Sequence, residues 1–421
     1  MTDPDAHADP RAAAHRAVEA VWRIESARVI AGLARMVGDV GLAEELAQDA
    51  LVIALERWPE TGIPPNPGGW LMSTAKHRAV DLLRRRKVYE HKLQEIGRDL
   101  DQDTGSAPDL DDHVGDDLLR LIFIACHPAL STEARVALAL RLLGGLTTDE
   151  VARAFLVPEA TVAQRIVRAK RTLAAKAIPF ELPARTELPA RLASVLEVLY
   201  LIFNEGYVGT AGADWARPDL CHEALRLGRV LAGLMPNEPE VHGLVALMEL
   251  HASRLPARRG ADGEPVLLDD QDRRRWDRLL IRRGLAALDR TEEASGRFGP
   301  YALQAAIAAC HARAASPGDT DWSRIAALYT VLGHVAPSPV VELNRAVAVG
   351  RAFGAAEGLA IVNALAGSGA LTHYPHLPAV RGDLLAELGR TGEARQEFER
   401  AAELTRNAAE RTVFLRRAEA S

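Results

Sequence analysis

Hydrophobic residues recur at spacings of three and four along almost the whole chain, which is the period of an amphipathic helix. Only 5% of the residues are aromatic and runs of β-branched residues are rare, so the pattern gives strands little support. A length of 421 residues favours about two to four domains over a single core. The sequence therefore predicts an all-α protein built from several helical domains.

The N-terminal residues 1–92 predict one domain of three helices, at 17–36, 42–55 and 70–87. Asp39, in the break between the first two helices, is suited to cap the second. Residues 59–69 are expected to form a loop because prolines and glycines crowd this stretch. Residues 93–115 contain many aspartates and few apolar side chains, which predicts an acidic, flexible linker to the next domain.

Residues 116–180 predict a small helical domain that contains a helix-turn-helix. Thr147 or Thr148 can cap a first short helix, and Leu156–Val157 can form the turn. Pro158 stands where a second helix would begin and where a residue without an N–H is tolerated.

Residues 181–421 read as helices joined by short loops rich in glycine and proline. One copy of a repeat shows the alternation of small and large residues found in tetratricopeptide (TPR) helix pairs, at Gly382, Leu385, Gly389, Ala394, Phe398 and Ala401. A weaker copy lies at 344–365, with Gly354 placed 35 residues before Gly389. The pattern predicts TPR-like stacking without a countable array.

The net charge of −6 alone argues mildly against nucleic acid as a partner, because an acidic surface repels phosphate. The basic residues are concentrated, however. Between Lys76 and Lys92 there are seven Lys or Arg against two acids, and residues 160–178 hold five Lys or Arg and no acid. These two segments are the candidates for contact with nucleic acid.

Targeting signals have no support in this sequence. The first 16 residues lack a basic start and an apolar segment, and no later apolar run approaches the length of a membrane span. Three cysteines cannot form a disulfide framework over this length. We therefore expect a cytoplasmic protein that does not contact the membrane.

The second helix of the helix-turn-helix presents side chains that can read DNA. Arginine can bind guanine through two hydrogen bonds, glutamine can do so with adenine, and further cations can neutralise phosphates. The residues suited to these contacts are Thr161, Gln164, Arg165, Arg168, Lys170 and Arg171. The alternative is a helix pair with a purely structural role whose charges are only solvated.

The predicted helix from Trp70 combines an aromatic ring with a dense basic face. Such a combination suits melted DNA, because exposed bases stack on rings and cations follow the backbone. The residues concerned are Trp70, Lys76, His77, Arg78, Arg84 and Arg85. The alternative is a core tryptophan in an incidentally basic helix.

These segments together resemble the extracytoplasmic-function (ECF) subfamily of RNA polymerase sigma factors. The region 2 pattern is carried by Asp39, Ala43, Glu44, Gln48, Asp49, Ala54, Trp58, Gly69, Trp70, Leu71, Ala75, Arg78, Asp81, Arg84 and Arg85. Residues 145–171 resemble region 4. The remainder of the chain resembles the group of these factors with a long TPR-like C-terminal extension. The segments that carry this resemblance are 199–207, 321–322 and 337–346.

The resemblance implies a sigma factor that binds core RNA polymerase, recognises −35 and −10 promoter elements and melts the −10 region. Glu44, Glu45, Gln48 and Asp49, which would share one acidic helix face, would dock on the β′ clamp helices, and the β flap would be a further contact. The basic helix would act at the −10 element and the second helix of the helix-turn-helix at the −35 element. The size of the extension, more than half of the chain, and its fused position suggest in addition that it regulates the factor, by binding a protein or a small ligand.

Other classes of protein have weaker support. No nucleophile, acid–base or phosphate-loop motif indicates an enzyme, and no cofactor is expected. The pairs Cys126–His127, Cys221–His222 and Cys310–His311 lack the spacing of a metal site and read as core residues. Asn204, Glu205 and Tyr207 interrupt an apolar helix and could line a ligand pocket. A TPR-containing helix-turn-helix regulator or scaffold that is not a sigma factor remains the alternative function.

Overall fold

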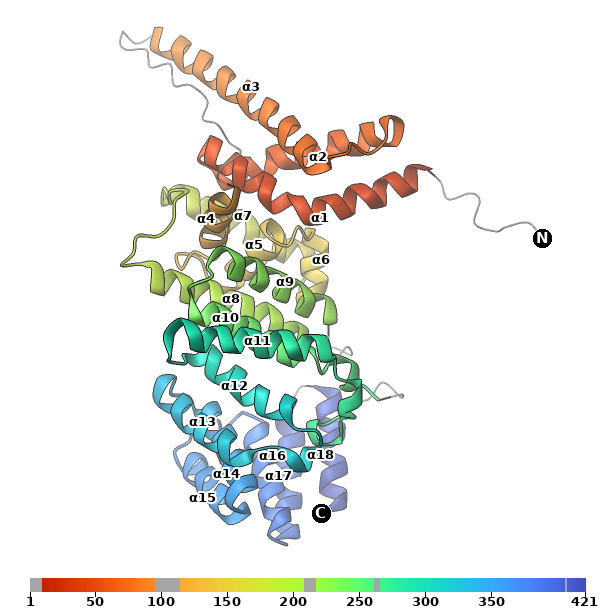
Figure 1. Ribbon diagram of the computed structural model, residues 1–421, viewed down its shortest axis with the longest axis vertical. Coiled ribbons are helices and arrows are strands. Elements are labelled where there is room, and N and C mark those ends of the chain that lie inside the picture. The colour runs from red at the N-terminus through yellow and green to blue at the C-terminus, as the bar shows by residue number, and fades with distance from the viewer. Residues whose placement is uncertain (1–9, 96–113, 208–216, 261–265, 406) are drawn as a thin grey trace, which may run out of the picture. The chain divides into compact units, whose positions relative to one another are not determined.

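The computed structural model describes residues 10–95, 114–207, 217–260, 266–405 and 407–421 (Figure 1). These residues form 18 α-helices and four short 3-10 helices, and no strand occurs among them. The all-α prediction is confirmed. The predicted linker at 93–115 lies largely outside the described residues.

The chain divides into two compact units, residues 1–198 and 199–421, and the boundary falls inside helix α8 (Leu188–Tyr207). The first unit contains α1 (Pro10–Val37), α2 (Val40–Thr61), α3 (Pro67–Glu95), α4 (Val114–Ala125), α5 (Thr132–Leu142), α6 (Thr148–Phe155) and α7 (Glu159–Ala175). Each unit has its own buried apolar residues.

Helices α1, α2 and α3 pack against one another and bury large side chains between them, Ile30, Leu33, Trp58 and Leu71 among them. Asp39 caps α2 as predicted, because its carboxylate accepts a hydrogen bond of 2.8 Å from the backbone N–H of Leu42.

The loop predicted at 59–69 is shorter in the structure. Helix α2 continues through Pro59 to Thr61, and α3 begins at Pro67. Proline fits the first turn of a helix, where its missing N–H would have no partner in any case. The side chain of Asn66 accepts a hydrogen bond of 2.9 Å from the N–H of Gly69 and satisfies a free donor of that turn.

The helix-turn-helix is formed by α6 and α7 as predicted. Thr147 caps α6 in a reciprocal capping box with Glu150. Leu156 ends α6 in the left-handed conformation at φ 50°, and α7 begins directly after Pro158. The sharp turn between the helices therefore has a local cause in the sequence.

The N-terminal half of α8 packs on α4 and α5 through buried polar contacts. Arg135 donates to the hydroxyl of Ser194 at 2.5 Å and to the carboxylate of Glu197 at 2.9 Å. Ser194 in turn donates to the carbonyl of Cys126 at 2.6 Å. These bonds fix the start of α8 to the first unit.

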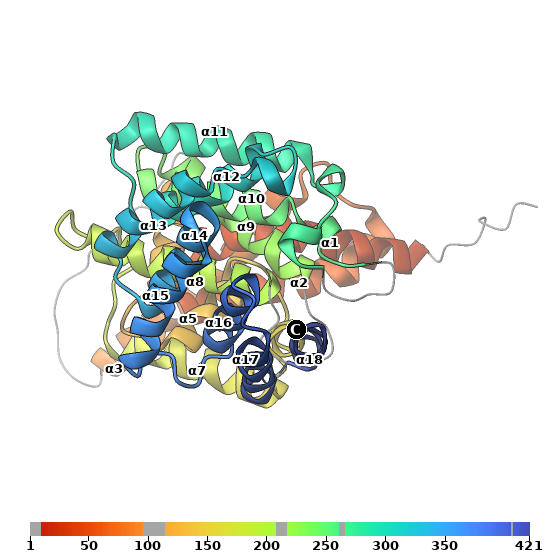
Figure 2. The same ribbon diagram turned by 90° about the horizontal axis from the view of Figure 1, so that it is seen from below.

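The second unit is a succession of helices in which each packs on the next (Figures 1 and 2). It contains α9 (Pro218–Leu234), α10 (Pro239–Ala252), α11 (Arg278–Ser295), α12 (Pro300–Arg313), α13 (Trp322–Val335), α14 (Pro339–Phe353), α15 (Ala355–Gly367), α16 (His376–Glu387), α17 (Thr391–Leu404) and α18 (Ala408–Ala420). Short 3-10 helices lie at Leu255–Ala257, Leu268–Asp270, Arg273–Arg275 and Pro317–Asp319.

The predicted repeat corresponds to the helix pair α16–α17. A Cβ atom at Gly382 would lie 2.9 Å from the ring of Phe398, so only glycine allows this close approach. Gly389 makes the turn between the helices at φ +73°. The weaker copy is the pair α14–α15, where Gly354 turns the chain at φ +114°.

Among the described residues, no helix has the length and the apolar character that crossing a bilayer requires.

Candidate polymerase and promoter interface

The exposed face of α7 carries five of the six side chains predicted to read the −35 element. Val162, Ile166, Ala169 and Leu173 form the buried stripe of this helix. At about 100° per residue, Thr161, Gln164, Arg168 and Arg171 lie on the side away from that stripe, and Arg165 lies at one edge of the stripe. Gln164, Arg168 and Arg171 are exposed, while Thr161 and Arg165 are half-buried.

Lys170 does not belong to this face. It lies at the other edge of the buried stripe, and its Nζ is 2.5 Å from Oε2 of Glu44 on α2. The structure therefore joins one predicted DNA-binding residue to one predicted polymerase-binding residue.

Glu44 is buried, with 3% of its surface exposed. Its Oε1 accepts hydrogen bonds from Nε of Arg141 at 2.7 Å and from Nε2 of Gln48 at 2.6 Å, and Lys170 is paired with Oε2. A buried carboxylate needs such partners, because it has lost the hydration that stabilises its charge.

The four predicted polymerase-binding residues are thus not one exposed acidic face. Glu45 and Asp49 are exposed and Gln48 is half-buried, whereas Glu44 points to α5 and α7. The sequence-based prediction placed all four on one acidic helix face. It missed the burial because the partners of Glu44 come from helices that are distant in the sequence.

Asp49 and Arg78 form an ion pair of 2.5 Å between α2 and α3. About half of each side chain is exposed, 51% for Asp49 and 46% for Arg78. Such an exposed pair contributes little to stability and can exchange for other partners. The acidic and basic predicted sites therefore meet at this point of the first unit.

Trp70 stands at the start of α3, and its ring packs edge-to-face with that of Trp58. The ring centroids are 5.4 Å apart and the planes are inclined by 68°. Trp58 is buried, whereas Trp70 is half-buried. Part of the Trp70 ring belongs to the core and part is available to a ligand.

The basic residues of α3 surround its buried residues Leu71, Ala75 and Ala79. Four of the predicted −10 residues have exposed side chains and one, Lys76, is half-buried; the exposed ones are His77, Arg78, Arg84 and Arg85. The helix thus presents cations to solvent along its outer surface.

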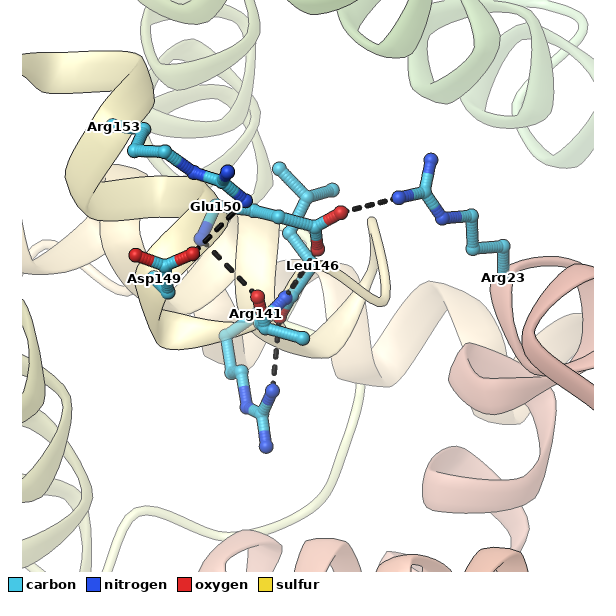
Figure 3. Close-up of polar contacts among 7 residues, drawn as sticks. Arg23, Arg141, Leu146, Asp149, Glu150 and Arg153 are labelled. Atoms are coloured by element: carbon cyan, nitrogen blue, oxygen red, sulfur yellow. Dashed lines mark hydrogen bonds and ion pairs between the residues drawn. The ribbon is translucent and has the colours of Figure 1, made fainter. Parts of the chain in front are cut away.

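Two further ion pairs connect α1 with the helices after the linker. Arg23 is paired with Glu150 of the capping box, as Figure 3 shows, and Arg35 lies 3.1 Å from the buried Asp117. Figure 3 also shows Arg141 donating to the carbonyl of Leu146. The sequence-based prediction did not single out Arg23, Arg35 or Arg141. A charged residue inside the apolar segment 134–143 was the available signal for Arg141.

The three cysteines are buried, as expected of core residues. Burial raises the pKa of Cys126 and of Cys221 to about 12 and also raises that of Cys310. Within the described ranges, no group of three or more His, Cys, Asp or Glu side chains is placed to hold a metal ion.

The polar residues near the end of α8 separate in the structure. Asn204 is exposed, Glu205 pairs with Arg217 at 2.6 Å, and the buried Tyr207 accepts a hydrogen bond of 2.7 Å from Arg254. The guanidinium of Arg258 lies 3.6 Å from the centre of the Tyr207 ring. Tyr207 thus belongs to a network of arginine and aromatic side chains in the second unit.

Comparisons with known families assign three parts of the chain. Residues 23–88 match Sigma-70 region 2, and residues 120–173 match Sigma-70 region 4. Residues 191–292 match a family of unknown function, DUF6596. Helices α1–α3 and α4–α7 therefore fall, in whole or in part, in the two sigma regions.

Two curated proteins show the extent of the similarity. An uncharacterized protein of Rhizobium meliloti is 46% identical over 387 residues, which cover 91% of this chain and 90% of that protein. A probable ECF RNA polymerase sigma factor, SigI of Mycobacterium tuberculosis, is 29% identical over 161 residues, 38% of this chain and 55% of that protein. The first relative contains the extension, and the second corresponds to a part of the chain.

Among solved structures, yeast Tom70 covers 97% of this chain and 83% of its own at 12% identity and a TM-score of 0.31. A score this low supports no conclusion about fold or function.

The two matched regions and the helix-turn-helix define the class of the protein, a sigma factor of transcription initiation. More narrowly, the chain belongs to the ECF-type sigma factors that carry a long C-terminal extension. Sigma factors of this kind are DNA-binding regulators without a catalytic site of their own.

Proposed function

We propose that this protein binds core RNA polymerase, reads the −35 element with α7 and opens the −10 region with α3. The observation that carries the proposal is the exposed polar face of α7. This helix is the second of a helix-turn-helix that lies inside the Sigma-70 region 4 match. That helix is the one which enters the major groove in proteins of this design.

The −35 contacts divide into two kinds. Arg165 and Gln164 lie near the N-terminal end of α7 and would contact base edges, together with Thr161. Arg168 and Arg171 lie one to two turns further along and would neutralise phosphates. Base contacts give sequence preference, and phosphate contacts give affinity that depends on salt.

The −10 contacts would use the outer surface of α3. The exposed cations follow the displaced strand, and the free part of the Trp70 ring offers a surface on which a base can stack. Residues 62–66, which connect α2 and α3, precede Trp70 closely in the sequence, and we include them in the proposed −10 site.

Docking on the β′ clamp helices would use Glu45, Gln48 and Asp49 on α2, and Glu44 once its partners release it. The β flap would receive region 4. The extension, more than half of the chain, would regulate these contacts through a protein or a small ligand. We propose no enzymatic step for any of its residues.

Binding to core polymerase separates this function from that of a conventional helix-turn-helix regulator or scaffold. The double variant Glu45→Ala/Asp49→Ala removes two exposed carboxylates, so it should weaken binding to purified core polymerase about tenfold or more, measured by fluorescence anisotropy. The matched control is Glu56→Ala/Glu60→Ala, which removes two exposed carboxylates from the same helix. Equal affinity of the two double variants, or no binding by the unaltered protein, would contradict the proposal.

A further inference from the structure

We infer that region 2 (α1–α3) and region 4 (α4–α7) close on each other in the free protein, and that Arg141 and Lys170 then withhold Glu44 from the polymerase. This inference rests on the proposed function and concerns the regulation of the same site. It assigns to the first unit an inhibitory contact of its own, apart from any action of the C-terminal extension.

The central contact uses one group from each of two proposed surfaces. The carboxylate of Glu44 is held by Arg141 at 2.7 Å and by Lys170 at 2.5 Å, and it is almost fully buried. A carboxylate can dock on a basic partner surface only when it is exposed to that surface. Closure and docking through Glu44 therefore exclude each other.

Lys170 is subject to the same competition. Its ammonium group faces Glu44 rather than the exposed side of α7, so it cannot neutralise a phosphate while the pair is intact. The remaining exposed −35 residues of α7 stay accessible. Closure should consequently reduce polymerase binding strongly and DNA binding only slightly.

Other ion pairs also hold region 2 and region 4 together. Asp117, with 3% of its surface exposed, is paired with Arg35 of α1 at 3.1 Å and with Arg120 of α4 at 2.6 Å. Arg23 is paired with Glu150 (Figure 3). These pairs connect α1 to α4 and to α6.

Close packing accompanies the ion pairs. A Cβ atom at Gly145 would lie 2.9 Å from Oγ of Ser26, which is fully buried on α1. The side chain of Ser26 thus lies directly against Gly145, so side chains at these two positions would meet. The interface combines charge pairs with direct van der Waals contact.

The charge pairs allow the closure to be reversible. The side chains of Arg141 and Lys170 keep 20% and 22% of their surface exposed, so both cations can return to water when a competing surface takes the carboxylate. Partly exposed pairs also weaken as ionic strength rises. The partner that opens this contact is a basic protein surface, which is the chemistry expected of the docking site on polymerase.

A disulfide between Ser26→Cys and Gly145→Cys tests the closure directly. The unaltered protein, treated with the same oxidant, controls for any oxidation of the native Cys126, Cys221 and Cys310. Under oxidation we expect the bond to form, identified by peptide mass spectrometry, and binding to core polymerase to fall about tenfold or more. Reduction should restore binding, and the Ser26→Cys single variant should not respond to the oxidant.

Three outcomes are distinguishable. If the two cysteines stay unbonded, or the oxidised protein binds polymerase as tightly as the reduced one, the closure is contradicted. If neither the reduced variant nor the unaltered protein binds polymerase, the proposed function itself fails.

Gly145 has a φ of +66°, so a side chain at this position would strain the backbone. A second variant keeps the test independent of that strain. Arg141→Gln removes one partner of Glu44 and should raise the affinity for core polymerase about fivefold or more. Its matched control is Arg153→Gln, which breaks an exposed pair with Asp149 inside α6. Equal affinities of these two variants for polymerase would overturn the inference.

Discussion

At the scale of single residues, arginines at different positions along α7 have different proposed roles, one in base contact and one in phosphate contact. Arg165 and Arg171 are both cations outside the buried stripe of the helix, but Arg165 lies in its second turn and Arg171 in its last turns. Only the N-terminal part of a recognition helix reaches base edges. The two arginines should therefore respond differently to substitution.

We expect Arg165→Ala to lower the preference for one base pair of the −35 element by about 1–3 kcal/mol, because a contact with a base edge is lost. Arg171→Ala should weaken binding to all sequences alike and reduce the dependence of the binding constant on salt by about one ion. Competition binding with a set of single-base promoter variants, at two salt concentrations, measures both effects. A uniform loss for Arg165→Ala would make it a phosphate contact.

His311 makes the stability of the second unit depend on pH. Burial, and then the nearby Arg254 and Arg273, lower its pKa from 6.5 to about 4. Below pH 6.5 the unfolded chain binds a proton that the folded chain does not accept, so stability is lost as the pH falls from 6.5 to 4.

The variant His311→Phe keeps an aromatic ring beside Trp322 and removes the titrating group. Between pH 7 and pH 5 it should lose less stability than the unaltered protein, by about 1–2 kcal/mol. Urea unfolding at the two pH values measures the difference. Parallel losses in the two proteins would show that His311 is not protonated on unfolding.

At the scale of secondary-structure elements, the helix-turn-helix is specified by its own sequence. Thr147 and Glu150 cap α6 through reciprocal hydrogen bonds of 3.1 and 2.8 Å, and Leu156 ends it. Because Glu150 also pairs with Arg23, the same cap connects α6 to α1.

Replacing Thr147 by alanine should destabilise the first unit by about 1 kcal/mol, since the N–H of Glu150 loses its acceptor. Thr147→Ser retains the hydroxyl and should remain within about 0.5 kcal/mol of the unaltered protein. Thermal unfolding followed by circular dichroism compares the two variants. An equal effect of both would mean that the methyl group, not the hydrogen bond, matters.

Local signals of this kind were sufficient for much of the fold. Periodicity predicted the helices, Asp39 predicted the start of α2, and the spacing around Gly382 predicted the α16–α17 pair. The extent of the 59–69 loop was wrong because prolines at helix ends were read as helix breakers.

The candidate site was predictable only where it lies on one helix. The exposed face of α7 follows from its spacing, whereas the burial of Glu44 does not. Arg141, the partner of Glu44, is 97 residues away from it in the sequence, and such a contact has no local signature. Long-range ion pairs of this type are set by how helices pack, which periodicity does not encode.

At the scale of the whole molecule, the sigma regions occupy less than half of the chain and the extension forms the remainder. Since α8 packs on α4 and α5 through Arg135 and Arg191, a shortened protein should end after Tyr207 and keep that helix. If the fused extension regulates the factor as proposed, the shortened protein should initiate transcription at a different level from the full chain. Unchanged transcription and unchanged polymerase affinity would contradict a regulatory role.

The most direct measurement of the central claim is run-off transcription by purified core polymerase on a library of promoter fragments, with and without the full-length protein. We predict transcripts from a specific subset of fragments that share −35 and −10 sequences, and loss of these transcripts with Glu45→Ala/Asp49→Ala. Tight DNA binding without a specific transcript, from the full chain and from the protein shortened after Tyr207 alike, would contradict the assignment as a sigma factor.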